Sequence, residues 1–495
     1  MQTTSVKWRS PLRSDHFLQS ISAFGLAKVV SWIAGTTLLV LLPRYLSDEN
    51  VGRLVLGSVL VTLIGTTTEL GITTYLAREI AREPERADSL IGNAMAMRIP
   101  LSLLGLILTV AVASVAGYDD LTKQVVYLFC IGYLVAPLST VVNGALQGFH
   151  QMKAMACYSA LLSSLNFAAA VVIIHVGGGL VELVLAEVVT GVIALAIATR
   201  VMLRFTRLSL RFEGRTWRAI VLGGLPFFTQ AAGTLAYSKI DVLQLSWMTN
   251  DAVVGWYGLA YRLMGIPVFV PATIMMVSFP ALAATVSDRV RFQAMARRAI
   301  RLVVFASLPM GVGIMVLADK LIVLLGFSEG FANAVILLVI LAPHIVLIGV
   351  NMQIGTVLNA SGGHWKWTTI AIAAAGLSSL ANLMAIPVTQ ALWGNGAIGA
   401  AIVTVLTETF LFAASLRLLP AGLLDTATAA RAAKCLVAGG MMALALWALR
   451  DLSLFLLVPL GAVLYLATAV ALRAVSLDDL RELRRTGREV PVASV

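Results

Sequence analysis

The stretch AIVLGGLPFFTQAAGTLAYSKIDVLQLSW, residues 219–247, indicates the fold class of the whole chain. As a helix it is long enough to cross a hydrocarbon core of about 30 Å. It contains one Lys and one acidic residue, Lys239 and Asp241, which lie two positions apart. Similar apolar runs recur along the chain, and the alternating pattern of an outer-membrane barrel is absent. These features predict an all-α polytopic membrane protein.

The composition agrees with a membrane protein. Of the 495 residues, 59% are hydrophobic and 12% are charged, whereas a soluble domain carries about 25% charged residues. The apolar runs predict about fourteen transmembrane helices. The predicted spans are 18–43, 53–77, 90–116, 124–147, 155–176, 180–203, 219–247, 253–283, 296–319, 331–359, 367–388, 395–418, 430–449 and 452–472.

The basic balance of the chain, a net charge of +11, is explained by membrane topology. When the N-terminus is placed in the cytoplasm, most of the 36 Lys and Arg residues fall in cytoplasmic segments. This asymmetry is the positive-inside rule, and it predicts that both termini are cytoplasmic. A nucleic-acid partner is not expected, because the sequence has no soluble basic module with interleaved aromatic residues.

Two pairs of segments indicate an internal repeat. LPRYLSDENVGRLVL (42–56) and SWMTNDAVVGWYGLA (246–260) both place acidic or amide residues before Val-Gly and an apolar run. APLSTVVNGALQGFHQMK (136–153) and APHIVLIGVNMQIGTVLNASGGHWK (342–366) both begin with Ala-Pro and end with Gly, His and Lys. Six spans is an even number, so the two halves would point the same way, as in the parallel repeats of some transporters.

The repeat predicts two parallel six-helix bundles followed by two additional helices. The last segment of the chain is Arg-rich and amphipathic, which fits either a short helix on an anionic membrane surface or a solvated tail. The predicted limits are 1–17 for a cytoplasmic N-terminal tail, 18–206 for the first bundle, 207–218 for a basic cytoplasmic linker, 219–420 for the second bundle, 421–475 for the two additional helices and 476–495 for a basic cytoplasmic tail.

Besides Lys239, three cations lie within predicted spans: Lys28, Arg98 and Arg262. A charge at the bilayer centre costs about 2.5–3.5 kcal/mol on insertion scales, so it normally faces a cavity or a partner. Because these cations come from both halves, a shared central cavity could gather them, where they would suit an anionic headgroup. The alternative is structural ion pairing, for example of Arg98 with Glu69 or of Arg262 with Asp241.

Acids also lie within spans, and the candidates for the cavity are Asp241, Glu408 and Glu69, while Glu187 lies in the outer part of span 180–203. Asp241 is the better candidate for a cavity wall, because the longer Lys239 lies close enough to the outer end of its span to snorkel. Acids beside the cavity cations could couple H+ or Na+ movement to transport. His344 could titrate near neutral pH, but a neutral, hydrogen-bonded structural histidine is the preferred interpretation. No cofactor is expected.

An enzyme is not expected. No outside loop exceeds about 15 residues, which leaves no room for a catalytic domain between the spans. The neighbouring acids Asp119 and Asp120 fit a solvated turn. The chain has no Walker A motif. The three cysteines, Cys130, Cys157 and Cys435, have no metal-binding spacing and are interpreted as packing residues, so no metal site is predicted.

ELGITTYLAREIAR (69–82) resembles the signature of polysaccharide flippases, of the O-antigen and exopolysaccharide type, in the multidrug/oligosaccharidyl-lipid/polysaccharide (MOP) exporter superfamily. LPRYLSDENVG, IDVLQLSWMTNDAVVGWYGLAYRL and GALQGFHQMK are similar to segments of the same family. The resemblance implies two V-shaped six-helix bundles around a central cavity. It also implies alternating access that moves an undecaprenyl-diphosphate-linked oligosaccharide from the cytoplasmic to the outer leaflet.

By the same resemblance, the diphosphate would be bound by Lys28, Arg98 and Arg262. Arg78 and Glu79 would lie at the cytoplasmic mouth, either as a structural pair or as a substrate contact. The protein would reside in the bacterial cytoplasmic (inner) membrane as a monomer, with a polysaccharide polymerase as a partner to be considered. Two alternatives are a lipid II flippase of the same superfamily and a cation-coupled multidrug exporter. The fourteen predicted spans and the in-span cations argue against the multidrug exporter.

Overall fold

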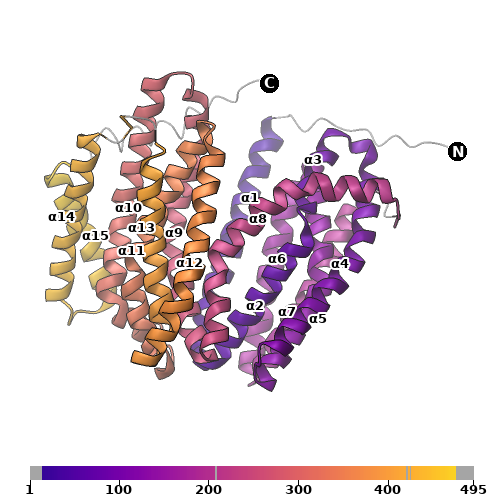
Figure 1. Ribbon diagram of the computed structural model, residues 1–495, viewed down its shortest axis with the longest axis horizontal. Helices are drawn as coiled ribbons and strands as arrows, with labels where there is room; N and C mark the ends of the chain where they lie inside the picture. The colour runs from indigo at the N-terminus through magenta and orange to yellow at the C-terminus, as the bar shows by residue number, and fades with distance from the viewer. Residues whose placement is uncertain (1–13, 207–208, 420–421, 424, 475–495) are drawn as a thin grey trace. The chain divides into compact units, whose positions relative to one another are not determined.

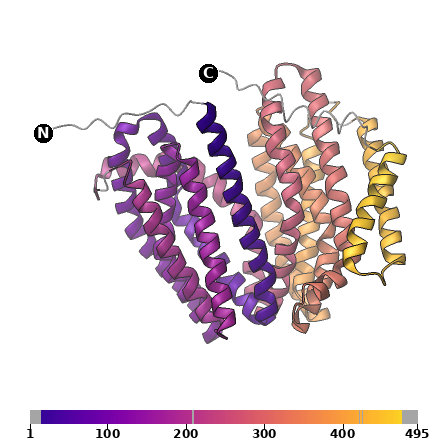
Figure 2. The same cartoon turned by 180° about the vertical axis from the view of Figure 1, so that it is seen from behind.

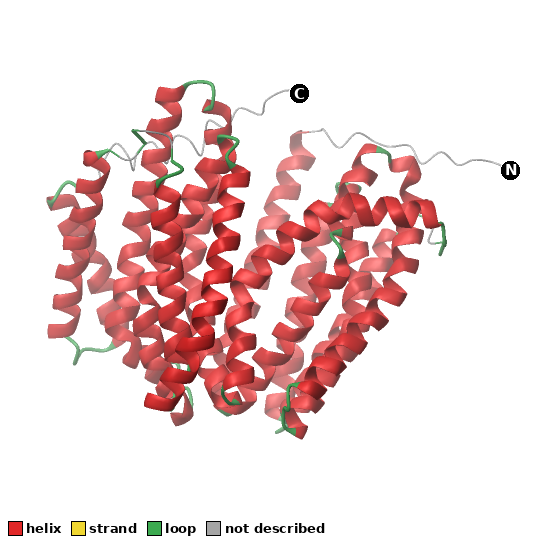
Figure 3. Ribbon diagram, in the orientation of Figure 1, coloured by secondary structure: helices red, strands yellow, loops and turns green. Residues whose placement is uncertain are grey.

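The computed structural model describes residues 14–206, 209–419, 422–423 and 425–474. Within these residues every regular element is helical (Figures 1 and 3). The predicted C-terminal tail, 476–495, and residues 1–13 of the predicted N-terminal tail lie outside the described residues. The prediction of an all-α chain is therefore confirmed for the part of the chain that the structure describes.

The helices follow one another with short connections. Their bounds are α1 Ser14–Tyr45, α2 Asp48–Glu69, α3 Ile72–Arg82, α4 Ala87–Val115, α5 Asp120–Gly148, α6 Met152–His175, α7 Leu180–Met202, α8 Gly214–Met248, α9 Asp251–Thr285, α10 Arg289–Leu324, α11 Ala334–Ala360, α12 His364–Trp393, α13 Ala397–Leu416, α14 Thr426–Ala448 and α15 Leu454–Ala471. Two 3-10 turns, Pro84–Arg86 and Glu329–Asn333, precede α4 and α11.

The predicted spans coincide with helices. In the described part of the chain, twelve helices are long and apolar enough to cross a membrane. Helix α8 passes the same test as two segments, Gly214–Leu235 and Tyr237–Met248, with a bend of 52° between them. Helix α1 adds a shorter apolar stretch, Val29–Tyr45. The polytopic architecture is thus confirmed with twelve to thirteen candidate spans, against the fourteen predicted.

The first of two compact units comprises Met1–Leu46 and Arg53–Lys239. Within it α1 packs on α6, α5 packs on α4 and α7, and α6 packs on α7. A buried apolar cluster joins α3, α4, α5 and the first part of α8. Its members include Leu76, Ile91, Val142 and Ile220, each of which is fully buried.

The second unit comprises Ser47–Gly52 and Ile240–Val495. Its centre is α11, which packs on α9, α10 and α13, while α12 packs on α13. Helices α14 and α15 pack on each other and on α10, at the edge of this unit (yellow in Figure 2). Buried Cys435 belongs to this contact, in agreement with the packing role predicted for the cysteines.

The chain breaks between α2 and α3, inside the predicted span 53–77. Leu70 and Gly71 adopt positive φ angles of 52° and 69°, which end α2 at Glu69. A Cβ on Gly71 would lie 2.2 Å from the main-chain oxygen of Gly224, so only glycine fits this close approach. The predicted limits of the second span are therefore wrong at their end, and Glu69 lies at a helix terminus rather than deep within a span.

Helix α3 is a short amphipathic helix. In the sequence its first residues look like the end of a span, because they continue the apolar run. Its buried residues, Ile72, Tyr75, Leu76 and Ile80, recur at intervals of three and four and therefore form one face. This face packs against α5. The signature sequence 69–82 thus encodes the end of α2, a left-handed break and a helix held against the bundle.

Equivalent residues of the two predicted repeats contact each other in the second unit. Asp48 begins α2 and Asp251 begins α9, and a Val-Gly pair follows at the same spacing in each. A Cβ on Gly52 would lie 1.8 Å from the main-chain oxygen of Asp251, and one on Gly255 would lie 2.1 Å from that of Asp48. This reciprocal glycine contact supports the repeat inferred from the sequence.

The turn predicted at Asp119 and Asp120 is the start of α5. Asp119 is the N-cap residue, and its Oδ1 accepts a hydrogen bond from the backbone N–H of Thr122 at 3.0 Å. Its Oδ2 lies 3.0 Å from the guanidinium of Arg53. Burial raises the pKa of Asp119, but the hydrogen bonds from Thr122 and the guanidinium of Arg53 outweigh it, so that the pKa lies below its ordinary value.

We expect acid to weaken the start of α5 through Asp119. Because its pKa is lower in the folded chain, its stabilisation is complete above the unfolded-state pKa of about 3.9 and is lost as the pH falls through the folded-state pKa. Asp119→Ala should lower the free energy of unfolding by about 1 kcal/mol at neutral pH. Asp119→Asn, which retains a capping side chain, should keep most of that stability. Thermal melting in detergent would test this, and equal melting temperatures for the wild type and Asp119→Ala would contradict it.

Candidate functional site

Arg98 is the most deeply buried of the predicted cavity cations whose side chains the structure describes. Its side chain, on α4, is 1% exposed. It donates hydrogen bonds to the main-chain oxygen of Thr68 at 3.1 Å and to Oγ1 of Thr140 at 2.8 Å. Thr68 lies in the last turn of α2, where carbonyl groups lack helical partners and a cation is favoured by the helix dipole. Arg98 therefore caps the C-terminus of α2.

The side chain of Glu69, the last residue of α2, reaches across the same break to α3. Its Oε1 accepts a hydrogen bond from the backbone N–H of Thr73 at 3.3 Å, in the first turn of α3. An acid at a helix N-terminus is stabilised by the unpaired N–H groups there. The structure thus brings Glu69 and Arg98 to one place, the α2–α3 break, where each stabilises a helix end.

Arg78 and Glu79 form the ion pair that the sequence left as one of two interpretations. Arg78 Nε lies 2.8 Å from Glu79 Oε1. The Arg78 guanidinium also lies over the rings of Tyr75, at 5.5 Å, and Phe227, at 5.4 Å, so it links α3 to α8 by cation–π contact. Burial, with the Glu79 carboxylate nearby, raises the pKa of Tyr75. The Arg78 side chain keeps 41% of its surface exposed.

The remaining in-span cations lie on α1, α8 and α9. The backbone of Lys28 belongs to α1, and its side chain lies outside the described side chains. Arg262 is half-buried on α9 in the second unit. Lys239, at the end of the first unit, is also half-buried. The gathering of Lys28, Arg98 and Arg262 around one anion stays a prediction.

Asp241 is held in a buried polar cluster of the second unit. Its side chain is 7% exposed, and its Oδ1 accepts from the backbone N–H of Val242 at 2.8 Å. Its Oδ2 accepts a hydrogen bond from the hydroxyl of Tyr257 on α9. The Tyr257 hydroxyl also lies 3.1 Å from Oγ1 of Thr404 on α13. Asp241 thus connects α8 to α9 and α13.

Glu408 is the centre of a second group of buried polar residues in the same unit. It is 1% exposed on α13. Nδ2 of Asn351, on α11, donates to Glu408 Oε2 at 2.6 Å and to the main-chain oxygen of Glu408 at 3.0 Å. His344 also lies on α11, seven residues before Asn351, and its Nδ1 is 3.7 Å from Glu408 Oε1. Two helices therefore place an acid, an amide and an imidazole in direct proximity.

Aromatic rings connect the two groups. Tyr257 and Tyr261 stack with ring centroids 5.8 Å apart. Tyr261 and His344 follow at 6.0 Å. The predicted coupling acids Asp241 and Glu408 thus belong to one continuous buried network across α8, α9, α11 and α13. The structure brings these two acids into one network and places the third, Glu69, in the first unit.

The chain matches the family described as polysaccharide biosynthesis protein over residues 17–286, more than half of its length. The chain belongs to that family. Several solved structures are similar to it in fold. Lipid II flippase MurJ, in an inward closed conformation, superposes with a TM-score of 0.74 at 14% identity, covering 92% of this chain and 99% of MurJ.

An inward-facing MATE family multidrug resistance transporter of the MOP superfamily gives a TM-score of 0.62 at 16% identity, over 80% of this chain and 94% of that one. A mutant of the Vibrio cholerae MATE transporter VcmN gives 0.54 at 15% identity, over 81% and 98%. No curated protein matches the chain in sequence. The predicted family is confirmed, and the chain is a multi-pass membrane protein with the fold of MurJ and of the MATE transporters.

Four members of the buried network in this transporter were not singled out from the sequence: Tyr257, Tyr261, Asn351 and Thr404. Helical spacing contains the signal, because Tyr257 and Tyr261 are four apart, Thr404 and Glu408 are four apart, and His344 and Asn351 are seven apart. Each pair therefore shares a helix face. Which faces meet depends on helix packing, which the spacing within one helix does not specify.

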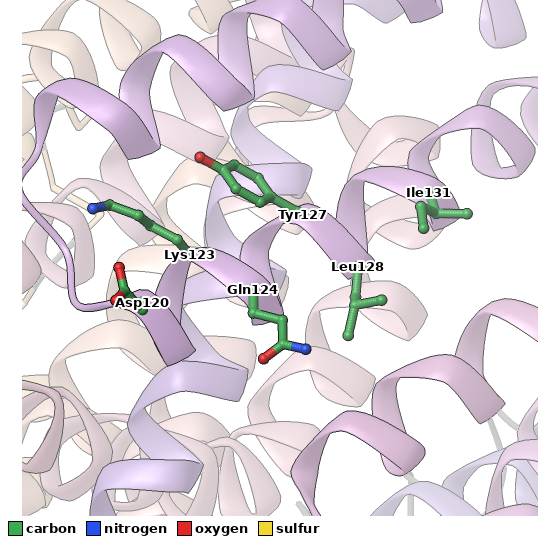
Figure 4. Close-up of a pocket in the computed structure, with 6 residues that line it drawn as sticks. All are labelled: Asp120, Lys123, Gln124, Tyr127, Leu128 and Ile131. Atoms are coloured by element: carbon green, nitrogen blue, oxygen red, sulfur yellow. The ribbon is translucent and has the colours of Figure 1, made fainter.

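A hollow of about 300 Å³ lies along the first half of α5 (Figure 4). It is lined by Asp120, Lys123, Gln124, Tyr127, Leu128 and Ile131. All six belong to one helix, and none is a predicted site residue. In the described part of the chain, no group of three His, Cys, Asp or Glu side chains could hold a metal ion. The buried network around Asp241 and Glu408 is therefore the strongest candidate site of the transporter.

Proposed function

We propose that this transporter moves an undecaprenyl-diphosphate-linked oligosaccharide from the cytoplasmic to the outer leaflet by alternating access. The observation that carries the proposal is the match to the polysaccharide biosynthesis protein family over residues 17–286. Surface polysaccharides are built from lipid-linked units, so a membrane transporter in such a family needs a lipid-linked glycan as cargo. The sequence carries no Walker A motif, so the two ways to drive transport are coupling to an ion, H+ or Na+, and movement down a substrate gradient, and we favour ion coupling.

The substrate headgroup would be bound by the in-span cations. A diphosphate suits Arg, which offers paired N–H donors, and Lys, which offers a compact charge. Lys28 and Arg262 would contact the diphosphate directly. Arg98, which is 1% exposed and already donates to Thr68 and Thr140, would reach it only by exchanging these bonds. Arg78, on its aromatic support, would receive the headgroup at the cytoplasmic mouth.

The membrane and the orientation follow from the same proposal. A lipid-linked glycan made at the cytoplasmic face of a bacterium must cross the cytoplasmic membrane. The distribution of Lys and Arg supports cytoplasmic placement of both termini. A polysaccharide polymerase on the outer side would use the delivered units, and the transporter would act as a monomer.

A lipid II flippase is the second candidate function. One observation favours it: the fold comparison with MurJ covers 92% of this chain, whereas those with the MATE transporters cover 80% and 81%. Both substrates are undecaprenyl-diphosphate-linked sugars, so the cation arrangement suits either. The family match favours the polysaccharide substrate.

The test is to delete the gene, extract the lipids and identify what accumulates. An undecaprenyl-diphosphate-linked oligosaccharide in the inner leaflet, cleared when the full chain is returned, supports the proposal. Accumulated lipid II would instead support the second candidate. Sensitivity to cationic dyes without any accumulated lipid-linked sugar would contradict both and favour a multidrug exporter.

A further inference from the structure

We infer that the second unit carries a proton-binding site at Glu408, with His344 and Asn351 as its partners, and that the proton is the coupling ion. The inference rests on the proposed function, because only an ion-coupled transporter needs such a site. It goes beyond the sequence-based prediction, which left the ion open between H+ and Na+ and gave His344 a structural role.

The site is buried and its polar atoms are incompletely paired. Glu408, Asn351 and His344 are 1%, 2% and 4% exposed. Two buried atoms beside the Glu408 carboxyl make no hydrogen bond, Asn351 Oδ1 and His344 Nδ1. Buried polar atoms without partners are rare and destabilising. Their position around one acid indicates a group that exchanges partners as its protonation state changes.

Asn351 is suited to both states of Glu408. An ionised carboxylate needs a donor, and Asn351 Nδ2 supplies one at 2.6 Å. A protonated carboxyl needs an acceptor, and Asn351 Oδ1 is a buried acceptor on the same amide. Rotation of the amide exchanges one for the other, since an asparagine side chain carries both a donor and an acceptor group. A hydrophobic or cationic partner could serve only one of the two states.

His344 gives the proton a second position. Its Nδ1 lies 3.7 Å from Glu408 Oε1, slightly beyond hydrogen-bond distance. Imidazole nitrogens exchange protons near neutral pH. Pro343, the residue before His344, interrupts the hydrogen-bond ladder of α11 because it lacks a backbone N–H. A small adjustment of α11 at this point would bring the imidazole into contact with the acid.

The other charged or titratable groups near Glu408 come from α8 and α9. Asp241 on α8 is bound by Tyr257 and by the backbone N–H of Val242. Helix α9 contributes Tyr257, Tyr261 and the half-buried Arg262. Helix α12, which also packs on α13, has no titratable side chain from Trp367 to Trp393. Of these two acids, Glu408 has the imidazole of His344 beside it.

The donors around Glu408 favour a proton over Na+. A sodium ion is held by several oxygen atoms, as other hard cations are. Two of the groups that approach the Glu408 carboxyl are an amide N–H₂ and an imidazole nitrogen. An N–H group that points at Oε2 opposes a cation at the same oxygen. Neutralisation by a proton removes the buried charge and makes the Asn351 amide an acceptor instead of a donor, which changes the contact between α11 and α13.

The first test is infrared spectroscopy of the purified full-length transporter in detergent, titrated from acid to alkaline pH. The chain has 25 Asp and Glu residues, so the band of one acid is isolated by subtracting the spectrum of a variant from that of the wild type. The difference between wild type and Glu408→Gln should contain a carboxylic acid band that disappears on titration. The difference between wild type and Glu213→Gln, which replaces a half-exposed acid outside the network, should lack that band, as should the difference for Asp241→Asn. His344→Gln should shift the midpoint at which the Glu408 band disappears. A difference spectrum of Glu408→Gln without a titrating band would overturn the inference, and melting temperatures would verify that each variant is folded.

The second test uses liposomes that hold the transporter and a pH-sensitive dye. The substrate is the lipid-linked glycan extracted from the deletion strain. Coupled sites typically change each other's affinity by about 5- to 150-fold. The wild type should therefore show a pH-dependent affinity of that size and proton flux with the glycan, and Glu408→Gln should lose both. Glycan movement driven by Na+ and unchanged in Glu408→Gln would overturn the proton site and leave the flippase proposal intact. If the wild type moved no glycan, the proposed function would fail, while the infrared titration would still decide the site.

Discussion

Gly255→Val is expected to lower the free energy of unfolding of the second unit by about 3 kcal/mol or more, at the upper end of the cost of overpacking a core. A Cβ at this position would lie 2.1 Å from the main-chain oxygen of Asp48 and 3.1 Å from the backbone nitrogen of Gly52. Both neighbours are backbone atoms, so no side-chain rotation can relieve the clash. The start of α2 or of α9 would have to move.

Gly265→Val is the matched control. It introduces the same side chain into the same helix, where nothing lies within 4 Å of the added Cβ. Thermal melting of the purified transporters should separate the two, with Gly265→Val close to the wild type. Gly52→Val should behave like Gly255→Val, because its Cβ would lie 1.8 Å from the main-chain oxygen of Asp251. Similar melting temperatures for Gly255→Val and Gly265→Val would show that the contact is not tight.

The spans could be predicted because hydrophobic length is a one-dimensional property. A run such as 219–247 exceeds the thickness of a bilayer, whatever it packs against. The α2–α3 break could not be found in this way. Residues 70–77 continue the apolar pattern, and the break depends on the left-handed conformation of Leu70 and Gly71 and on the close approach of Gly224. Close approach between distant segments leaves little trace in local hydropathy.

For the charged residues, too, the sequence predicts one property and leaves another to helix packing. The sequence identified Asp241, Glu408, Glu69 and Arg98 because charges within spans are rare and need partners. It could not assign the partners, since those lie on other helices. Asp241 meets Tyr257, sixteen positions away, and Glu408 meets Asn351, 57 positions away. The sequence therefore predicts that a charge within a span needs a partner. Helix packing decides whether that charge stabilises a helix end or belongs to a buried network.

Arg98→Gln is the second substitution expected to have a large effect. It removes the donors to the Thr68 carbonyl and to Thr140 Oγ1 and shortens a side chain that is 1% exposed. Hydrogen bonds from charged groups contribute about 1.5–3 kcal/mol each, so the free energy of unfolding should fall by about 3 kcal/mol. Arg98→Lys keeps the charge but not the forked donor geometry, and it should restore only part of the loss.

Two roles for Arg98 lead to different results. If it caps α2, Arg98→Gln should lower the melting temperature and make the Leu70–Gly71 break more sensitive to proteolysis, with or without substrate. Thr140→Val removes one partner and leaves the cation in place, so a double-mutant cycle of the two substitutions should show a coupling of about 0.5–3 kcal/mol. If Arg98 instead contacts the diphosphate, Arg98→Gln should abolish glycan transport while melting and proteolysis remain unchanged. Because the cap joins α2 and α4 at the start of the signature helix α3, we expect the first result.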